Sequence, residues 1–290
     1  MSNMSTKASG IRIQRRPTNG VTLHVAEAGP PEGRLVVLLH GFPEFWYGWR
    51  HQIDVLAAAG YRVVVPDQRG YNLSDRPGGV AAYDIDQLAL DIFGLADDVG
   101  RQTFSVVGHD WGAGVGWWMA TGASANRIER FVAMSAPHPA VWDEAIRTIP
   151  EQRKKSWYVK AFNIPWLPEF LIRQRNYKAL ADALREGKRP EACTDEDLAR
   201  YREAWSQPGA LTAMINWYRA RRNFAQAPPR ITFPTLIIWG DSDRYGVPEL
   251  ADRCGQLCDR GSVVHLDASH WVQHDMTEQI NSMLLDFLKG

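Results

Sequence analysis

The sequence has no excess of charge of either sign. Lys plus Arg and Asp plus Glu number 33 each among 290 residues, so the formal net charge is zero. A basic excess is what draws a protein to nucleic acid or to an anionic membrane, so the balance argues against both partners. The chain also lacks a basic-then-apolar leader at its start, and its longest apolar runs, such as LVVLL at 35–39, are only strand-sized. We therefore predict a cytoplasmic protein with no nucleic-acid or membrane partner.

Cysteine is also scarce. The chain has Cys193, Cys254 and Cys258, an odd number at no obvious disulfide or zinc spacing. Cys254 and Cys258 would share a helix face, but two soft ligands alone make a poor metal site. The pattern predicts reduced thiols in a cytosolic protein and gives no reason to expect a metal or an organic cofactor.

Short β-branched runs recur along the chain and are mostly apolar without clean alternation. Such runs are typical of strands buried on both faces of a parallel sheet. Two earlier segments, IRIQRR and VTLHVAEAG, alternate better and predict an edge hairpin that turns at Asn19 and Gly20. The buried runs are RLVVLLH (34–40), YRVVVPD (61–67), FSVVG (104–108), RFVAMS (130–135), TLIIWG (235–240) and SVVHLD (262–267).

Helical patterns lie between these strands, as at 85–100, directly after Asp110, and at the end of the chain in TEQINSMLLDFLKG. The alternation predicts a doubly wound α/β sheet. It breaks between Pro137 and about Pro229, where helical segments replace strands; TDEDLARYREAW starts one of them, with Thr194 as its N-cap. We predict a core in two parts, 1–136 and 230–290, with a helical cap at 137–229.

The stretch SVVGHDWGAGV (105–115) has the outline of a nucleophile elbow, a sharp strand-to-helix turn that usually presents a serine. Gly108 and Gly112 frame the turn, but its central residue is Asp110. Aspartate is also a good helix N-cap, yet a cap alone does not explain glycines on both sides of the turn. We predict that Asp110 is a nucleophile.

A histidine and a second carboxylate follow later strands. His270, in DASHWVQ, comes just after SVVHLD, and elbow hydrolases carry their histidine late in the chain. Asp243, in WGDSDRYGVP, follows TLIIWG and is placed to orient that imidazole. Because ligands of open α/β sheets bind beyond the carboxyl ends of the strands, all three side chains are expected at one site. The main rivals are His274 and Asp241.

The segment HGFPE (40–44) follows RLVVLL, and a glycine-containing turn there can supply a backbone N–H to an oxyanion hole. The second donor is the N–H of the residue after the nucleophile. These donors would be Phe42 and Trp111.

An aspartate at the elbow changes the chemistry. A serine needs its histidine to remove a proton before attack, whereas Asp110 is already ionised at neutral pH. A carboxylate is a modest nucleophile toward carbonyls but attacks saturated carbon that carries a leaving group, which gives an alkyl-enzyme ester. His270 is then free to activate a water molecule that hydrolyses the ester. The predicted reaction is alkyl transfer to Asp110 followed by hydrolysis.

From about Thr22 to the end, the chain resembles the epoxide hydrolases of the α/β-hydrolase fold. The segments that carry the resemblance are HGFPEFWYGWR, PDQRGYNLSDRP, GHDWGAG, the helical insertion and DASHWVQ. It implies a mostly parallel, eight-stranded sheet flanked by helices, with an inserted cap. GHDWG alone does not decide the activity, because haloalkane dehalogenases share it.

The leaving group separates the two activities. An opening epoxide leaves as a strongly basic alkoxide and needs O–H donors, such as tyrosine with its pKa of about 10. SWYVKAFNIP and INWYRARR resemble the two cap-tyrosine segments of the epoxide hydrolases, which implies that Tyr158 and Tyr218 donate to the epoxide oxygen. Many dehalogenases carry a halide-binding asparagine where this chain has Phe42. Fluoroacetate-type dehalogenases place arginines where it has Trp111 and Gly114.

These patterns predict an enzyme that converts an apolar epoxide and water to a vicinal diol, as a monomer or a homodimer. A haloalkane dehalogenase is the alternative, and a non-catalytic binding protein on the same fold is a third reading. Twelve Trp against ten Phe and nine Tyr fit a large apolar pocket. The residues expected to line it are Phe42, Trp111, His138, Trp157 and Trp217.

Overall fold

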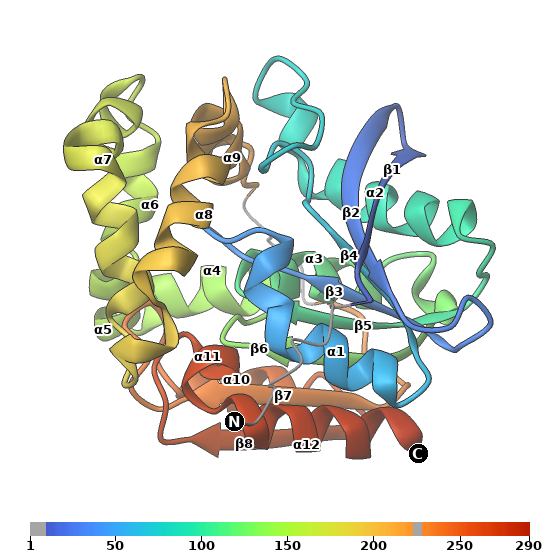
Figure 1. Cartoon of the computed structure of the whole chain (residues 1–290). Helices are drawn as coiled ribbons and strands as arrows, with labels where there is room; N and C mark the ends of the chain where they lie inside the picture. Colours follow the sequence, from blue (N-terminus) through green and yellow to red (C-terminus); the bar gives the residue numbers. More distant parts are fainter. Residues whose placement is uncertain (1–9, 223–227) are drawn as a thin grey trace, which may run out of the picture.

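A computed structural model describes residues 10–222 and 228–290 of the chain (Figure 1). Its centre is an eight-stranded sheet with the order β1-β2-β4-β3-β5-β6-β7-β8. This confirms the predicted α/β fold with a mostly parallel sheet. The strands are β1 (Arg12–Thr18), β2 (Val21–Ala28), β3 (Leu35–Leu39), β4 (Arg62–Pro66), β5 (Phe104–His109), β6 (Ile128–Met134), β7 (Thr235–Gly240) and β8 (Gly261–Leu266).

Strand β2 is antiparallel to both of its neighbours, while the pairs from β4 to β8 are parallel. The β1–β2 hairpin turns at Asn19 and Gly20, whose φ angles of 38° and 74° lie in the left-handed region. Asparagine and glycine tolerate that region better than other residues, which is why this pair forms the turn. The predicted hairpin and all six predicted strands are confirmed, but SVVHLD forms the edge strand β8, of which only Leu266 is buried.

Helices cover both faces of the sheet and divide its core in two. Ile53 of α1 and Leu284 of α12 pack on one face, while Leu95 of α2 and Val115 of α3 pack on the other. Within β3 the side chains alternate between the two faces, so a strand buried on both sides reads as an unbroken apolar run. The helices of the core are α1 (Arg50–Ala58), α2 (Ile85–Asp98), α3 (Trp111–Thr121), α10 (Glu249–Gly255), α11 (Val272–Asp275) and α12 (Thr277–Lys289).

Between β6 and β7, the described residues form helices and no regular strand (Figure 1). Thr194 caps α8 through a capping box with Asp197, as its sequence indicates. Helix α7 is interrupted at 174–177, where three residues have positive φ. The helices are α4 (Pro139–Thr148), α5 (Pro150–Lys155), α6 (Trp157–Phe162), α7 (Leu167–Arg185), α8 (Asp195–Ser206) and α9 (Ala210–Arg219).

The division at 136/137 and 229/230 into core and cap stays a prediction. Over the residues described, every helix is too short or too polar to cross a membrane.

Candidate active site

The turn between β5 and α3 holds Asp110 in a conformation that few residues adopt. Its φ and ψ are 50° and −123°, and a non-glycine residue with positive φ stores strain that surrounding contacts must offset. A Cβ on Gly112 would collide with the carbonyl group of Leu39, and one on Gly41 would collide with the Asp110 side chain. Glycines therefore let three backbone segments meet at this carboxylate.

His270 and Asp243 complete a chain of hydrogen-bonding groups that starts at Asp110. Oδ2 of Asp110 lies 3.6 Å from Nε2 of His270, and Nδ1 of His270 lies 2.8 Å from Oδ2 of Asp243. Oδ1 of Asp243 accepts hydrogen bonds from the backbone N–H groups of Tyr245 at 2.7 Å and Gly246 at 3.1 Å. The structure thus brings together all three residues that the sequence singles out.

The pKa values of this group reflect burial and charge together. Burial lowers the pKa of His270, but the charge of Asp243 and the contact with Asp110 outweigh it and raise the pKa to about 10. Burial raises the pKa of Asp110, but His270 outweighs that effect, so the net shift is downward. In the resting site the imidazolium therefore lies between two carboxylates.

Two backbone N–H groups face Asp110. The Phe42 N–H donates to Oδ1 of Asp110 at 2.8 Å. The backbone N–H of Trp111 also hydrogen-bonds the carboxylate and contributes to its lowered pKa. Oδ1 is thus held by the Phe42 amide while Oδ2 faces His270, so the two oxygens are suited to different roles.

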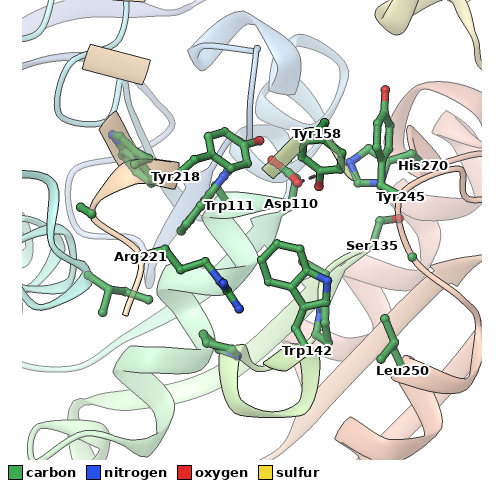
Figure 2. A pocket seen from close by; sticks show the side chains of 18 of the residues that line it. Asp110, Trp111, Ser135, Trp142, Tyr158, Tyr218, Arg221, Tyr245, Leu250 and His270 are labelled. Atoms are coloured by element: carbon green, nitrogen blue, oxygen red, sulfur yellow. Dashed lines mark ion pairs between the residues drawn. The ribbon is translucent and has the colours of Figure 1, made fainter. Parts of the chain in front are cut away.

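Tyr158 on α6 and Tyr218 on α9 approach the Asp110 carboxylate from the helical insertion, whereas His270 and Asp243 approach it from the sheet. Figure 2 shows both hydroxyl groups directed toward Asp110. Their ring centroids are 5.9 Å apart. Burial raises the pKa of each phenol well above its ordinary value, and the charge of Asp110 raises it further. Both therefore carry their protons at neutral pH and are available as O–H donors.

Two cavities meet at this point. The smaller, of about 80 Å³, extends past Trp142 and Leu250, and the larger, of about 790 Å³, lies beneath α6 and α7. Both are mainly apolar in lining. The residues that line both are Asp110, Tyr158, Tyr218, Tyr245 and His270.

The expected pocket residues divide between the cavities, with one exception. Phe42 and Trp157 line the larger one, and Trp111 and Trp217 line the smaller. His138 lines neither cavity within the described part of the chain, although Pro137 and Pro139 beside it line the smaller one.

The ring of His138 is used inside the protein instead. Nδ1 accepts from the Ala140 N–H at 3.1 Å as the N-cap of α4, and Nε2 lies 3.2 Å from the Thr121 hydroxyl. Burial lowers the pKa of this imidazole to about 4. His138 is therefore a neutral capping residue in this structure.

His274 and Asp241, the alternatives to His270 and Asp243, have partners elsewhere. Nε2 of His274 lies 2.7 Å from Oε1 of Glu44, and Asp241 lies 3.0 Å from the ring of His265 on the outer strand. Among the residues described, no group of three or more His, Cys, Asp or Glu side chains is arranged to hold a metal ion.

Sequence reasoning missed two residues of this region. The Tyr245 ring packs edge-on against the His270 ring, with 4.8 Å between the ring centroids, and Tyr245 lines both cavities. Glu44, 1% exposed, accepts a hydrogen bond from Tyr201 of α8 at 2.7 Å and from the Gln273 amide at 3.0 Å. A glutamate inside the apolar segment HGFPEFW was the available signal for the second, because buried carboxylates need several partners.

Comparison with known proteins places this geometry in a family. A family model described as alpha/beta hydrolase fold matches residues 34–277. The chain is 46% identical over 284 residues to the AB hydrolase superfamily protein YfhM of Bacillus subtilis, covering 97% of this chain and 99% of that protein. It is 34% identical to Epoxide hydrolase A of Mycobacterium tuberculosis, over 94% of this chain and 96% of that protein.

Solved structures agree with these relatives. The crystal structure of a Bacillus megaterium epoxide hydrolase in complex with an inhibitor superposes with a TM-score of 0.87 at 32% identity, covering 96% of this chain and all of that one. Another solved chain, an epoxide hydrolase from Vigna radiata, gives a TM-score of 0.81 at 29% identity. By sequence and by structure, this chain belongs to the epoxide hydrolases of the α/β-hydrolase fold.

Proposed function

We propose that the protein hydrolyses an apolar epoxide to a vicinal diol in two steps, with Asp110 as the nucleophile. In the first step Oδ2 of Asp110 attacks one epoxide carbon, and the bond from that carbon to the ring oxygen breaks. Tyr158 and Tyr218 hold the ring oxygen, and one of them donates its proton to the alkoxide as it forms. The product of this step is an ester between Asp110 and the substrate.

The second step removes the ester. Ester formation deletes the negative charge of Asp110, which is one cause of the raised pKa of His270. The imidazolium therefore gives up its proton more readily once the ester exists, and the proton goes to the tyrosinate that the first step leaves. Neutral His270, oriented by Asp243, then takes a proton from water as the water attacks Cγ of Asp110. The N–H groups of Phe42 and Trp111 stabilise the negative charge that develops on Oδ1. Collapse of the intermediate breaks the bond between Cγ and Oδ2, and the diol leaves with the proton that His270 took from water. Asp110 is left as a carboxylic acid and returns its proton to His270, which restores the resting site.

The observation that carries this proposal is the pair of phenol groups facing the carboxylate. Halide leaves as a stable anion and needs only N–H donors, whereas an alkoxide needs a proton. The Trp111 side chain, a natural N–H donor to halide, is hydrogen-bonded to Tyr218. The geometry around Asp110 thus favours departure of an oxygen over departure of a halide.

The cavities support a substrate shape. An epoxide held by both tyrosines lies where the two spaces join, so its substituents extend in opposite directions. The larger space accepts an aromatic or branched group, while the smaller holds only a few carbon atoms. The proposed substrates are apolar epoxides with one bulky and one short substituent.

The test compares purified wild type with a Tyr158→Phe, Tyr218→Phe double variant on styrene oxide and on 1-bromobutane. We expect diol formation by the wild type and a loss of roughly 10³-fold or more in kcat/KM in the double variant, because both O–H donors are removed. Tyr177→Phe, which alters another half-buried tyrosine of the same insertion, is the matched control and should keep near wild-type turnover. Bromide release without diol formation, or a double variant that turns over normally, would refute the proposal.

A further inference from the structure

Charge is balanced over the whole chain but not along it. Residues 150–189, which contain α5, α6 and α7, include ten Lys and Arg against four Asp and Glu. That segment carries an excess of six positive charges, and the rest of the chain carries the opposite excess. This segment is therefore strongly basic although the total is zero.

The same segment exposes large apolar side chains to solvent. Among the described residues, it holds every exposed large aromatic side chain: Trp157 is 66% exposed, Trp166 73% and Phe170 56%. Other exposed large apolar residues, such as Ile13 and Leu90, are aliphatic and occur on separate elements. We call the set formed by Trp157, Ile164, Trp166, Phe170 and Leu171 the α6–α7 apolar patch.

The patch borders the entrance to the site. Trp157, Ile164 and Leu171 line the larger cavity, and Trp166 and Phe170 line an adjoining shallow groove together with Arg173. Helices α6 and α7 contact each other and lie side by side in Figure 1. An apolar ligand that enters the larger cavity therefore passes the patch.

Cations surround the patch without matching anions. No carboxylate among the described residues forms an ion pair with Lys154, Lys160 or Arg173. Glu169, which lies between the exposed residues, is buried and paired with Arg219 at 2.6 Å. Its negative charge is thus used within the insertion, and the outer surface stays basic.

We propose that the α6–α7 apolar patch docks on anionic lipid surfaces. Exposed Trp and Phe side chains beside Lys and Arg match the headgroup region, where the rings enter the acyl boundary and the cations meet phosphate. A second copy of this chain is a poorer partner, because a two-fold contact would bring two excesses of positive charge together. Docking of this kind turns the larger cavity toward the lipid; delivery of apolar epoxides from the lipid into it rests on the proposed function.

The experiment is flotation of the full chain with vesicles of phosphatidylcholine alone or with 40% phosphatidylglycerol (roughly the charge density at which basic surface residues bind). We expect binding only to the anionic vesicles, and loss of binding in 0.5 M NaCl. Lys160→Gln, Arg173→Gln should lower the partition coefficient about 25-fold, since each basic residue near an anionic surface contributes about five-fold. Trp166→Ser, Phe170→Ser should lower it at least about 10-fold.

Matched controls change residues of the same kind away from the patch. Arg12→Gln and Leu90→Ser, both at exposed positions, should bind vesicles like the wild type. Flotation needs no substrate, so its result is independent of the hydrolase test. Both double variants, Lys160→Gln, Arg173→Gln and Trp166→Ser, Phe170→Ser, should leave turnover of water-dissolved epoxide unchanged. Equal binding of wild type and patch variants would overturn the proposal. So would a dimer in solution that Trp166→Ser, Phe170→Ser converts to monomer without any vesicle binding by the wild type.

Discussion

The two halves of the site are built on different principles. On the sheet side, Asp110, His270 and Asp243 are linked through hydrogen bonds and ion pairs, and the backbone N–H groups of Phe42, Tyr245 and Gly246 fix the carboxylates. On the helical side the tyrosines are held by aromatic contacts. The Phe162 ring lies 4.8 Å from Tyr218 and 5.8 Å from Tyr158.

This difference separates what must be fixed from what can adjust. Hydrogen bonds from backbone groups define the direction of each carboxylate oxygen, and the backbone is held by the sheet. Edge-to-face ring contacts fill space and tolerate small movements of a helix. In the proposed reaction, the sheet side therefore determines which bond is attacked, and the helical side determines which molecule is presented to it.

The largest expected effect comes from removing the nucleophile. Asp110→Ala should lower kcat by at least about 10⁴-fold, because Asp110 is the one carboxylate among the described residues that lines both cavities, and the amides alone do not form an ester. Asp241→Ala, which removes the exposed rival, should retain activity. Initial-rate assays of diol formation measure both variants. A rate for Asp110→Ala within roughly 10²-fold of wild type would show that water attacks the epoxide directly, without an ester intermediate.

A smaller effect is expected at the base. His270→Gln should lower turnover by about 10²- to 10⁴-fold, because only the hydrolytic step needs the imidazole. The Asp110 ester should then accumulate, visible by intact-protein mass spectrometry as a gain equal to one substrate molecule. His265→Gln on strand β8 serves as the control and should show no adduct. If His270→Gln is inactive and free of adduct, His270 is required for the first step as well.

The smallest effect on activity is expected where helix α8 of the insertion contacts the segment after β3. Tyr201 of α8 donates to buried Glu44 of the segment after β3, so Tyr201→Phe leaves a carboxylate oxygen without that donor. The free energy of unfolding should fall by about 1.5–3 kcal/mol, with kcat changed less than about three-fold.

Tyr47→Phe is the matched control, because its hydroxyl donates to Asp197 at a more exposed position. It should lower the free energy of unfolding by about 1 kcal/mol or less. Urea unfolding curves of both variants give the comparison. A fall in kcat at unchanged stability for Tyr201→Phe would show that Glu44 takes part in the reaction and does not merely hold the insertion to the sheet.

Local pattern was sufficient for much of the fold. Every strand that the sequence predicts is present, since runs such as LVVLL and SVVG are apolar on both faces and bounded by turn residues. The burial expected for SVVHLD was wrong, because β8 lies at the edge of the sheet. Strand ends also led to Asp110, Asp243 and His270 as candidates, because parallel strands bring their carboxyl ends to one edge of the sheet. The partners of the rivals His274 and Asp241, which are Glu44 and His265, became visible only in the structure.

Other features had no local signature. His138 was expected in the pocket because it lies where the predicted cap begins, but its ring caps the N-terminus of helix α4. The role of Tyr245 beside His270 depends on how the loop after β7 folds back. The zero net charge argued against a membrane partner, yet the chain has a basic segment that adjoins exposed aromatic residues. A net charge does not show how the charges are distributed over the molecule.

By itself, the sequence determined the fold class, the family resemblance and the carboxylate at the elbow, because these depend on residue type and short spacing. Tertiary structure alone decided that Tyr158 and Tyr218 face Asp110, that two unequal cavities meet there, and that the α6–α7 apolar patch borders the larger one. Those features join helices and strands separated by tens of residues. Their distances follow from how the elements pack, and packing is a property of the whole chain.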